Sequence, residues 1–123
     1  METRVLTVTR AKSGRRRRPA IKLQGDWLEE IGFTAGELVA AKYEKGRIIL
    51  QLQDFAQYRD LGKGELKPSS GLFQVRREKQ YSQIDIKGFW LERFGFTIGG
   101  VIAARYEYGL IKLLLIDPEM FTE

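Results

Sequence analysis

The sequence contains no cysteine and no histidine, and only three of its 123 residues are proline. Without cysteine the chain has no disulfide, no thiolate metal ligand and no thiol nucleophile, which is typical of an intracellular protein. Without histidine it lacks the usual general base of neutral-pH catalysis, and no Ser–His or Cys–His pair exists. We predict a cytoplasmic protein with no cofactor and no metal site. Any catalysis would depend on carboxylates, tyrosine, lysine and arginine.

Long apolar runs are also missing from this chain. None approaches the ~18–20 residues that cross a membrane, and the Met1 end lacks the apolar segment of a signal peptide. The glycines form neither of the common phosphate-binding patterns, GxGxxG and GxxxxGK[ST]. The sequence therefore predicts no membrane partner and no nucleotide loop of these two kinds.

A repeat dominates what the sequence does contain. When the chain is shifted by 63 residues, residues 20–52 align with 83–115 without a gap, and 17 of the 33 positions are identical. Identity of this degree indicates a tandem duplication. Halves of about 50 residues have marginal cores when alone, and a shared core relieves this. We predict repeat 1 over 1–52, a linker over 53–71 and repeat 2 over 72–117, forming one intertwined domain.

Both halves show the same order of predicted elements: a strand, a basic loop, a strand, a helical turn and a hairpin. This order differs from the βαβ alternation of a parallel sheet and predicts a mainly β fold with one short helix per half. A further short helix is predicted around Phe55 and Tyr58. The predicted segments are strands at 5–8, 20–23, 37–44, 47–52, 72–75, 83–86, 101–107 and 110–116, loops at 9–19 and 76–82, and helical turns at 25–36 and 88–99.

The helical turn of each half carries its own stop signal. Gly32 can adopt the left-handed conformation that ends a helix, which places Phe33 and Leu28 in the pair that packs in a Schellman cap. At the start, Asp26 is predicted to cap the helix, with Glu29 at capping-box spacing. The second half repeats the stop signal with Gly95, Phe96 and Leu91.

The pattern G-x-W-L-E-x-x-G-F-x-x-G, preceded by Pro19 and a short apolar strand and followed by a hairpin, resembles the SymE toxin family within the wider AbrB/MazE-like group. The resemblance covers 5–52 and 72–115. It implies a swapped-hairpin fold, in which two copies interlock into one small β-barrel. Here both copies lie in one chain, which predicts an intrachain pseudo-dimer and a monomeric protein. The resemblance also implies a nucleic-acid role, because SymE-like toxins act on RNA, AbrB-like proteins bind DNA and MazE-like proteins also bind a toxin partner.

Positive charge is concentrated near the N-terminus. The net charge is +5, and residues 1–18 contribute seven Lys/Arg and one acid, which is 7 − 1 = +6, so the remaining residues sum to −1. This asymmetry predicts a polyanionic partner, and the planar fork of arginine suits phosphate. AbrB-like proteins make DNA contacts through the first inter-strand loop, which supports the same location. We call the predicted RNA- or DNA-binding residues the basic set: Arg10, Lys12, Arg15, Arg16, Arg17, Arg18, Arg76, Arg77 and Lys79.

Three functional interpretations stay open at this point. The first is a module that binds RNA or DNA phosphates, and the second is a toxin that cleaves RNA on the same scaffold. The third is an antitoxin-like DNA-binding or protein-interaction module without catalytic activity. The simplest interpretation of the basic set is a solvated charge run without a ligand.

No catalytic residue stands out from the sequence. Carboxylates and tyrosines recur in both halves, but strand and capping positions favour structural roles for them. The two tryptophans could stack on bases, yet their place in a short amphipathic turn favours core packing. These recurring residues are Glu29 and Glu92, Glu44 and Glu107, Tyr43 and Tyr106, and Trp27 and Trp90.

Overall fold

The computed structural model describes residues 2–13, 16–54, 56 and 66–116. Two antiparallel sheets, one of six strands and one of four, account for most of this part of the chain. The mainly β class predicted from the sequence is confirmed. The elements in chain order are β1 (Glu2–Thr7), β2 (Thr9–Ser13), β3 (Arg16–Gln24), α1 (Asp26–Glu30), β4 (Leu38–Glu44), β5 (Arg47–Gln53), η3 (Pro68–Ser70), β6 (Leu72–Gln74), β7 (Arg76–Glu78), β8 (Tyr81–Lys87), η4 (Phe89–Phe94), β9 (Val101–Glu107) and β10 (Leu110–Ile116).

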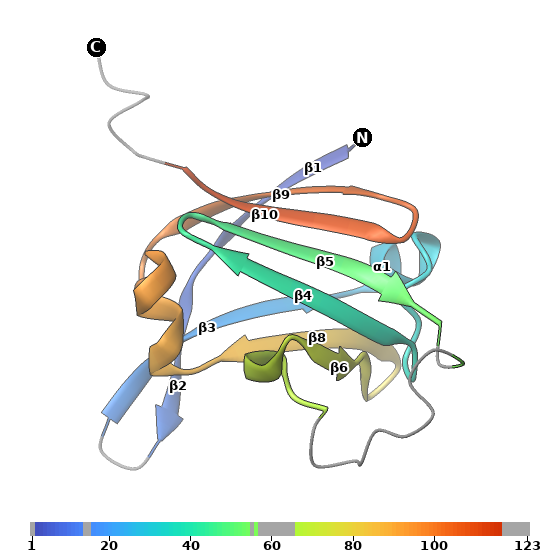
Figure 1. Cartoon of the computed structure of the whole chain (residues 1–123), viewed down its shortest axis with the longest axis horizontal. Helices are drawn as coiled ribbons and strands as arrows, with labels where there is room; N and C mark the ends of the chain where they lie inside the picture. Colours follow the sequence, from blue (N-terminus) through green and yellow to red (C-terminus); the bar gives the residue numbers. More distant parts are fainter. Residues whose placement is uncertain (1, 14–15, 55, 57–65, 117–123) are drawn as a thin grey trace.

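The two sheets pack face to face, and the short helices α1 and η4 lie at opposite ends of the molecule (Figure 1). The six-stranded sheet has the order β1-β9-β10-β5-β4-β6, and the four-stranded sheet has the order β2-β3-β8-β7. Among the described strands, neither sheet closes on itself. The predicted small barrel is therefore replaced by two open sheets.

Strands from the two halves of the chain pair with one another. The first strand of the chain, β1, pairs with β9 of the second hairpin, and β6 pairs with β4 of the first hairpin. The hairpins β4–β5 and β9–β10 meet along β5 and β10, and the two central strands of the four-stranded sheet, β3 and β8, also come from different halves. Four of the eight strand pairings among the described residues thus join one half of the chain to the other.

Two buried valines turn the chain from one sheet to the other. Val8 separates β1 from β2, and Val75 separates β6 from β7. The backbone N–H of Gly99 donates to the Val8 carbonyl at 2.9 Å, and that of Gly36 donates to the Val75 carbonyl at 2.8 Å. Because Gly36 and Gly99 are 63 residues apart, each corner rests on the equivalent loop of the other half.

Both predicted Schellman caps are present. The Phe33 N–H donates to the Leu28 carbonyl at 2.8 Å, and Gly32 has φ +91°. The second half makes the same bonds at Gly95 and Phe96. The predicted Asp26 cap is wrong, because Gly25 occupies the cap position at φ 129° and no side chain caps the helix. Asp26 is instead the first helical residue.

The core lies between the sheets and is filled by alternating residues of the strands. Ile21 and Leu23 of β3 and Ile84 and Ile86 of β8 are buried, as expected from the side-chain period of two. The predicted hairpins at 37–52 and 101–116 agree with the observed strands within a residue or two. Trp27 packs on Tyr106 with ring centroids 4.8 Å apart, and Trp90 packs on Tyr43 at 4.7 Å.

The two predicted basic loops are wrong as loops. Residues 9–13 and 16–20 form a hairpin, and residues 76–78 and 81–83 form a shorter one. The exposed arginine side chains leave the backbone N–H and C=O groups available for pairing between strands. The β2–β3 hydrogen-bond ladder therefore continues past the end of the core. The helix predicted around Phe55 and Tyr58 lies outside the described residues.

Candidate nucleic-acid interface

The β2–β3 hairpin carries most of the basic set. Its register places Arg10 opposite Pro19 and the Lys12 backbone opposite Arg17. The side chains of Arg10, Arg16 and Arg17 are exposed, and Arg18 is half-buried. Arg15 lies outside the described residues. The hairpin is a two-stranded ribbon that bears cationic side chains beyond the apolar core.

The β7–β8 hairpin carries the remaining members of the basic set. Arg76, Arg77 and Lys79 are exposed, and Lys79 has φ +56° in the two-residue turn. Arg76 Nη1 lies 3.1 Å from Asp85 Oδ2, so its charge is already paired. This hairpin is shorter than β2–β3 and presents two unpaired cations, Arg77 and Lys79, among the described residues.

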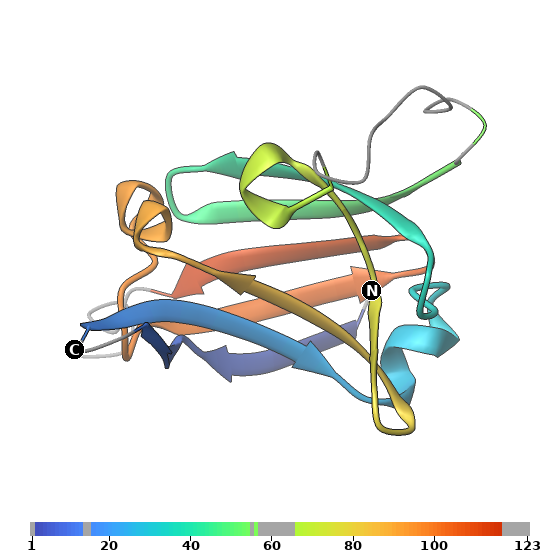
Figure 2. The ribbon, with the colours of Figure 1, turned by 90° about the horizontal axis from the view of Figure 1, so that it is seen from below.

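The structure keeps the tips of the two cationic hairpins apart, whereas Arg18 and Arg76, near the bases of the hairpins, line one pocket. Strands β3 and β8 are antiparallel, with Ala20 opposite Lys87 and Gln24 opposite Gln83. The start of each strand therefore lies beside the end of the other, and the two hairpin tips lie at opposite ends of the four-stranded sheet (Figure 2). A nucleic acid that touches both tips must run along this sheet.

Within the described part of the chain, no carboxylate lies at ion-pair distance from Arg10, Arg16, Arg17 or Arg18 of the long hairpin. Among the described members of the basic set, Arg76 is the one with a carboxylate within ion-pair distance. Like charges held close together in water are unfavourable, and the exposed side chains remain available to an external anion. The hairpin is a candidate surface for phosphate.

The sequence analysis missed three cations that the fold places near the basic set. Lys22 of β3 and Lys87 of β8 lie on the sheet face opposite the one that carries Ile21 and Ile86. Lys67, in the segment before η3, lines a pocket of about 500 Å³ together with Lys87. The period of two along β3 and β8 was the available signal for the first two, whereas no local pattern places Lys67 there.

Two of the recurring carboxylates, Glu29 and Glu44, and both recurring tyrosines have structural partners. Glu29 Oε1 accepts a hydrogen bond from Ser82 Oγ at 2.9 Å. Arg47 and Lys42 beside Glu44 hold the pKa of that carboxyl below its ordinary value. The Tyr43 hydroxyl donates to the Pro68 carbonyl at 2.7 Å, and burial raises the pKa of Tyr43. Tyr106 is buried and donates to Glu2 Oε2 at 3.0 Å. These contacts agree with structural roles.

The tryptophans are fixed by the protein itself. Each indole N–H donates to the carbonyl three residues earlier, at 2.9 Å for Trp27 and 3.2 Å for Trp90. The guanidinium of Arg4 lies 4.7 Å from the Trp27 ring centroid, which is a cation–π distance. Trp27 is only 7% exposed, so its faces are occupied. Trp90 is half-buried against Tyr43 and Phe94.

Within the described residues, no three or more Asp, Glu, His or Cys side chains gather closely enough to hold a metal ion. In the same part of the chain, no helix has the length and apolar character needed to cross a bilayer.

Comparison with known proteins gives one match. A family model described as "Toxin SymE, type I toxin-antitoxin system" matches residues 3–52. These residues run from β1 into β5 and include the whole β2–β3 hairpin and α1. No curated protein and no solved structure matches the chain.

Proposed function

We propose that the chain binds RNA or DNA phosphates through the β2–β3 hairpin, and the match of residues 3–52 to the SymE toxin family model supports this proposal. The observation that carries the proposal is the exposure of Arg10, Arg16 and Arg17 on one ribbon, without a carboxylate partner among the described residues. The planar guanidinium offers paired donors to phosphate oxygens. The second hairpin adds Arg77 and Lys79 to the surface.

The shape of the hairpin supports this assignment. A two-stranded ribbon is narrow enough to enter the major groove of B-form DNA, and it can also follow the backbone of a single strand. The ribbon is anchored to the core at Pro19 and Val8, both buried, so its base is held in place. Phosphate contacts made this way provide affinity and orientation, with no sequence preference of their own.

A binding assay with matched charge changes tests the proposal. Fluorescence anisotropy would measure the affinity of labelled single-stranded RNA and duplex DNA for the triple variant Arg10→Ala, Arg16→Ala, Arg17→Ala. The control variant, Lys45→Ala, Arg105→Ala, Lys112→Ala, removes the same charge from the six-stranded sheet. We expect the hairpin variant to lose most of its affinity and the control to keep it. Equal losses in both would remove the basis of the proposal.

The family match also favours a second proposal, that the protein is a toxin that acts on RNA. Glu29 and Glu44 are engaged in structural contacts. In this proposal, arginine or lysine would stabilise the charge that develops on the phosphate. Purified protein should then degrade RNA after repeated purification, and the activity should fall in the hairpin variant. Intact RNA under conditions of full binding would leave the protein as a binding module.

We further propose that the chain works as a monomer. The strands that pair between the two halves already satisfy one another within a single chain. A second chain is therefore not needed to complete either sheet. Light scattering should report a mass near 14.2 kDa, and a stable dimer would contradict this proposal.

A further inference from the structure

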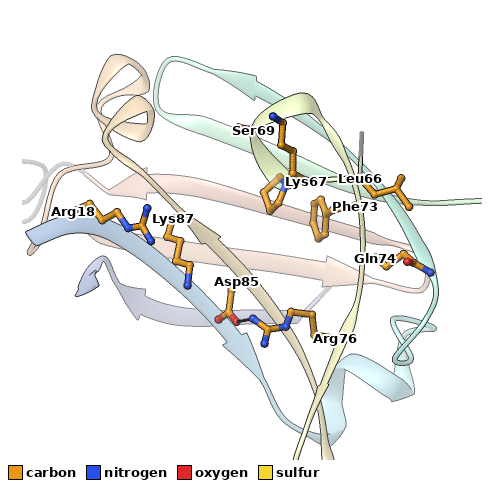
Figure 3. Close-up of a pocket in the computed structure, with 10 residues that line it drawn as sticks. Arg18, Leu66, Lys67, Ser69, Phe73, Gln74, Arg76, Asp85 and Lys87 are labelled. Atoms are coloured by element: carbon orange, nitrogen blue, oxygen red, sulfur yellow. Dashed lines mark hydrogen bonds and ion pairs between the residues drawn. The ribbon is translucent and has the colours of Figure 1, made fainter. Parts of the chain in front are cut away.

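A pocket of about 500 Å³ lies between the four-stranded sheet and the segment that leads through η3 into β6. Figure 3 shows Arg18 from β3, with Lys87 and Asp85 from β8, on one side, and Lys67 and Phe73 from the η3–β6 segment on the other. The remaining lining residues are Leu66, Pro68, Ser69, Gln74 and Arg76.

The pocket carries an excess of positive charge. Four of its lining residues are cations and one is an acid, which gives 4 − 1 = +3. The acid, Asp85, is already paired with Arg76. Arg18, Lys67 and Lys87 therefore line the pocket without a carboxylate partner among the described residues. The Nε atom of Arg18 is buried and has no hydrogen-bond partner in this part of the chain. A buried donor in this condition is costly unless an acceptor reaches it, and an anion would supply one.

The opposite wall of the pocket contains an apolar part beside Lys67. Leu66 and Pro68 contribute to it, and Phe73, which is only 4% exposed, packs into the core behind them. A ligand that fits must therefore combine an anionic group with a flat or apolar part. A nucleotide has both, and bases stack well on aromatic and apolar surfaces.

Hydrogen bonds hold this wall in place. The Tyr43 hydroxyl donates to the Pro68 carbonyl at 2.7 Å, and the Ala41 N–H donates to the Gly71 carbonyl at 2.8 Å. Gly71 has φ +85°, and a Cβ there would lie 3.1 Å from the Ala41 carbonyl oxygen. The segment is thus fixed to β4 at both ends of η3.

The residues that line the pocket are not repeated in the described part of the other half. Asp85 and Lys87 correspond, 63 residues earlier, to Lys22 and Gln24, and the η3 segment precedes the second half only. The pocket therefore depends on the joining of the two halves in one chain.

We propose that this pocket binds a nucleoside monophosphate, with the phosphate on Arg18, Lys67 and Lys87 and the base against Pro68. The same chemistry is offered by a free nucleotide and by the 5′-phosphorylated end of a strand. The strand-end form rests on the proposed nucleic-acid binding, whereas the free-nucleotide form does not.

Isothermal titration calorimetry with adenosine 5′-monophosphate and with inorganic phosphate tests the pocket directly. We expect the nucleotide to bind more tightly than phosphate, and Lys87→Ala to weaken it about tenfold, which is the effect of one charge-assisted hydrogen bond. Lys45→Ala, which removes the same charge away from the pocket, should bind the nucleotide as the unaltered protein does. No binding of the nucleotide, equal binding of inorganic phosphate, or no effect of Lys87→Ala would overturn the proposal.

A second arm separates the two ligand sources and the two proposals. Single-stranded RNA with and without a 5′-phosphate should differ in affinity if the pocket takes a strand end, and Lys87→Ala should remove that difference. Equal affinity for the two RNAs, together with nucleotide binding, assigns the pocket to free nucleotides. The Arg10, Arg16, Arg17 variant should lose RNA binding and keep nucleotide binding, so failure of the hairpin proposal is distinguishable from failure of the pocket.

Discussion

The two halves of this chain share their interior contacts and differ on their surface. Each tryptophan packs on a tyrosine from the other half, each helical turn ends in the same cap, and each corner valine bonds to the equivalent glycine loop. The surfaces diverge: one half has the long arginine hairpin, and the other has the short hairpin and the η3 segment. This contrast indicates that the shared contacts hold the fold, whereas the divergent parts are free to serve binding.

The interior is not perfectly equal between the halves. Trp27 is 7% exposed, and its ring lies against Tyr106 and the guanidinium of Arg4. Trp90 is only half-buried, and it packs on Tyr43 and Phe94. The first site is closed by the N-terminal strand, while the second leaves part of its indole in water.

The largest expected effect tests this difference between the tryptophans. Trp27→Ala should lower the free energy of unfolding by about 3–5 kcal/mol, and Trp90→Ala by a smaller amount, about 1–3 kcal/mol, because less of its surface is buried. Urea denaturation followed by circular dichroism measures both. Trp27→Phe is the matched control, since it keeps an aromatic contact with Tyr106. Equal costs at the two sites would show that the halves are equivalent in energy as well as in contacts.

Alkaline titration compares the tyrosines at a smaller scale. Burial raises the pKa of Tyr43 above its ordinary value of 10.0, so the unfolded chain ionises first. Its contribution to stability is complete below pH 10 and is lost as pH rises, by roughly 1.4 kcal/mol per pH unit. Tyr43→Phe should lose about 1 kcal/mol at pH 7 with its hydrogen bond to Pro68 and decline less steeply above pH 10. Tyr108→Phe, at a residue that is 76% exposed, should change neither the stability at pH 7 nor its decline above pH 10. If Tyr43→Phe loses stability above pH 10 as steeply as the unaltered protein, the assignment to Tyr43 is contradicted.

The smallest expected effect concerns the two hairpin turns. Glu44 contacts Lys42 and Arg47, which lower the pKa of its carboxyl. That contribution is present above the ordinary pKa of 4.5 and is lost as pH falls. Glu44→Gln should therefore flatten the acid side of the stability curve slightly in thermal melts. Glu107→Gln is the control, because Glu107 has no ion pair within the described residues. If both variants flatten the acid side of the stability curve equally, the contacts of Glu44 do not contribute to stability in solution.

Local sequence signals predicted the elements whose geometry is set locally. The hairpins around Gly46 and Gly109 and the caps at Gly32 and Gly95 follow from a period of two and from glycine's access to positive φ, which is observed at all four positions. The N-cap prediction failed because Gly25 is the N-cap residue and Asp26 is the first residue of the helix.

Features that depend on tertiary placement were not accessible from the sequence. The arginine-rich hairpin looked like a loop because its residues are polar, yet the ladder is set by backbone pairing with Pro19 and its neighbours. The pocket requires Lys67 and Lys87 to line the same cavity, and the bonds of Tyr43 to Pro68 and of Ala41 to Gly71 hold the η3 segment there. The basic set was predicted from its charge and from its place between the predicted strands. Its role in binding nucleic acid stays a prediction.

The salt dependence of nucleic-acid binding tests the central proposal most directly. If about six cationic side chains contact phosphates, the slope of log K against log salt should be about −4 on single-stranded RNA or about −5 on duplex DNA. The Arg10, Arg16, Arg17 variant should reduce the slope by about 2–3, and Arg77→Ala with Lys79→Ala should reduce it by about 1–2. A slope near zero, or one that the first variant leaves unchanged, would contradict phosphate binding by the β2–β3 hairpin.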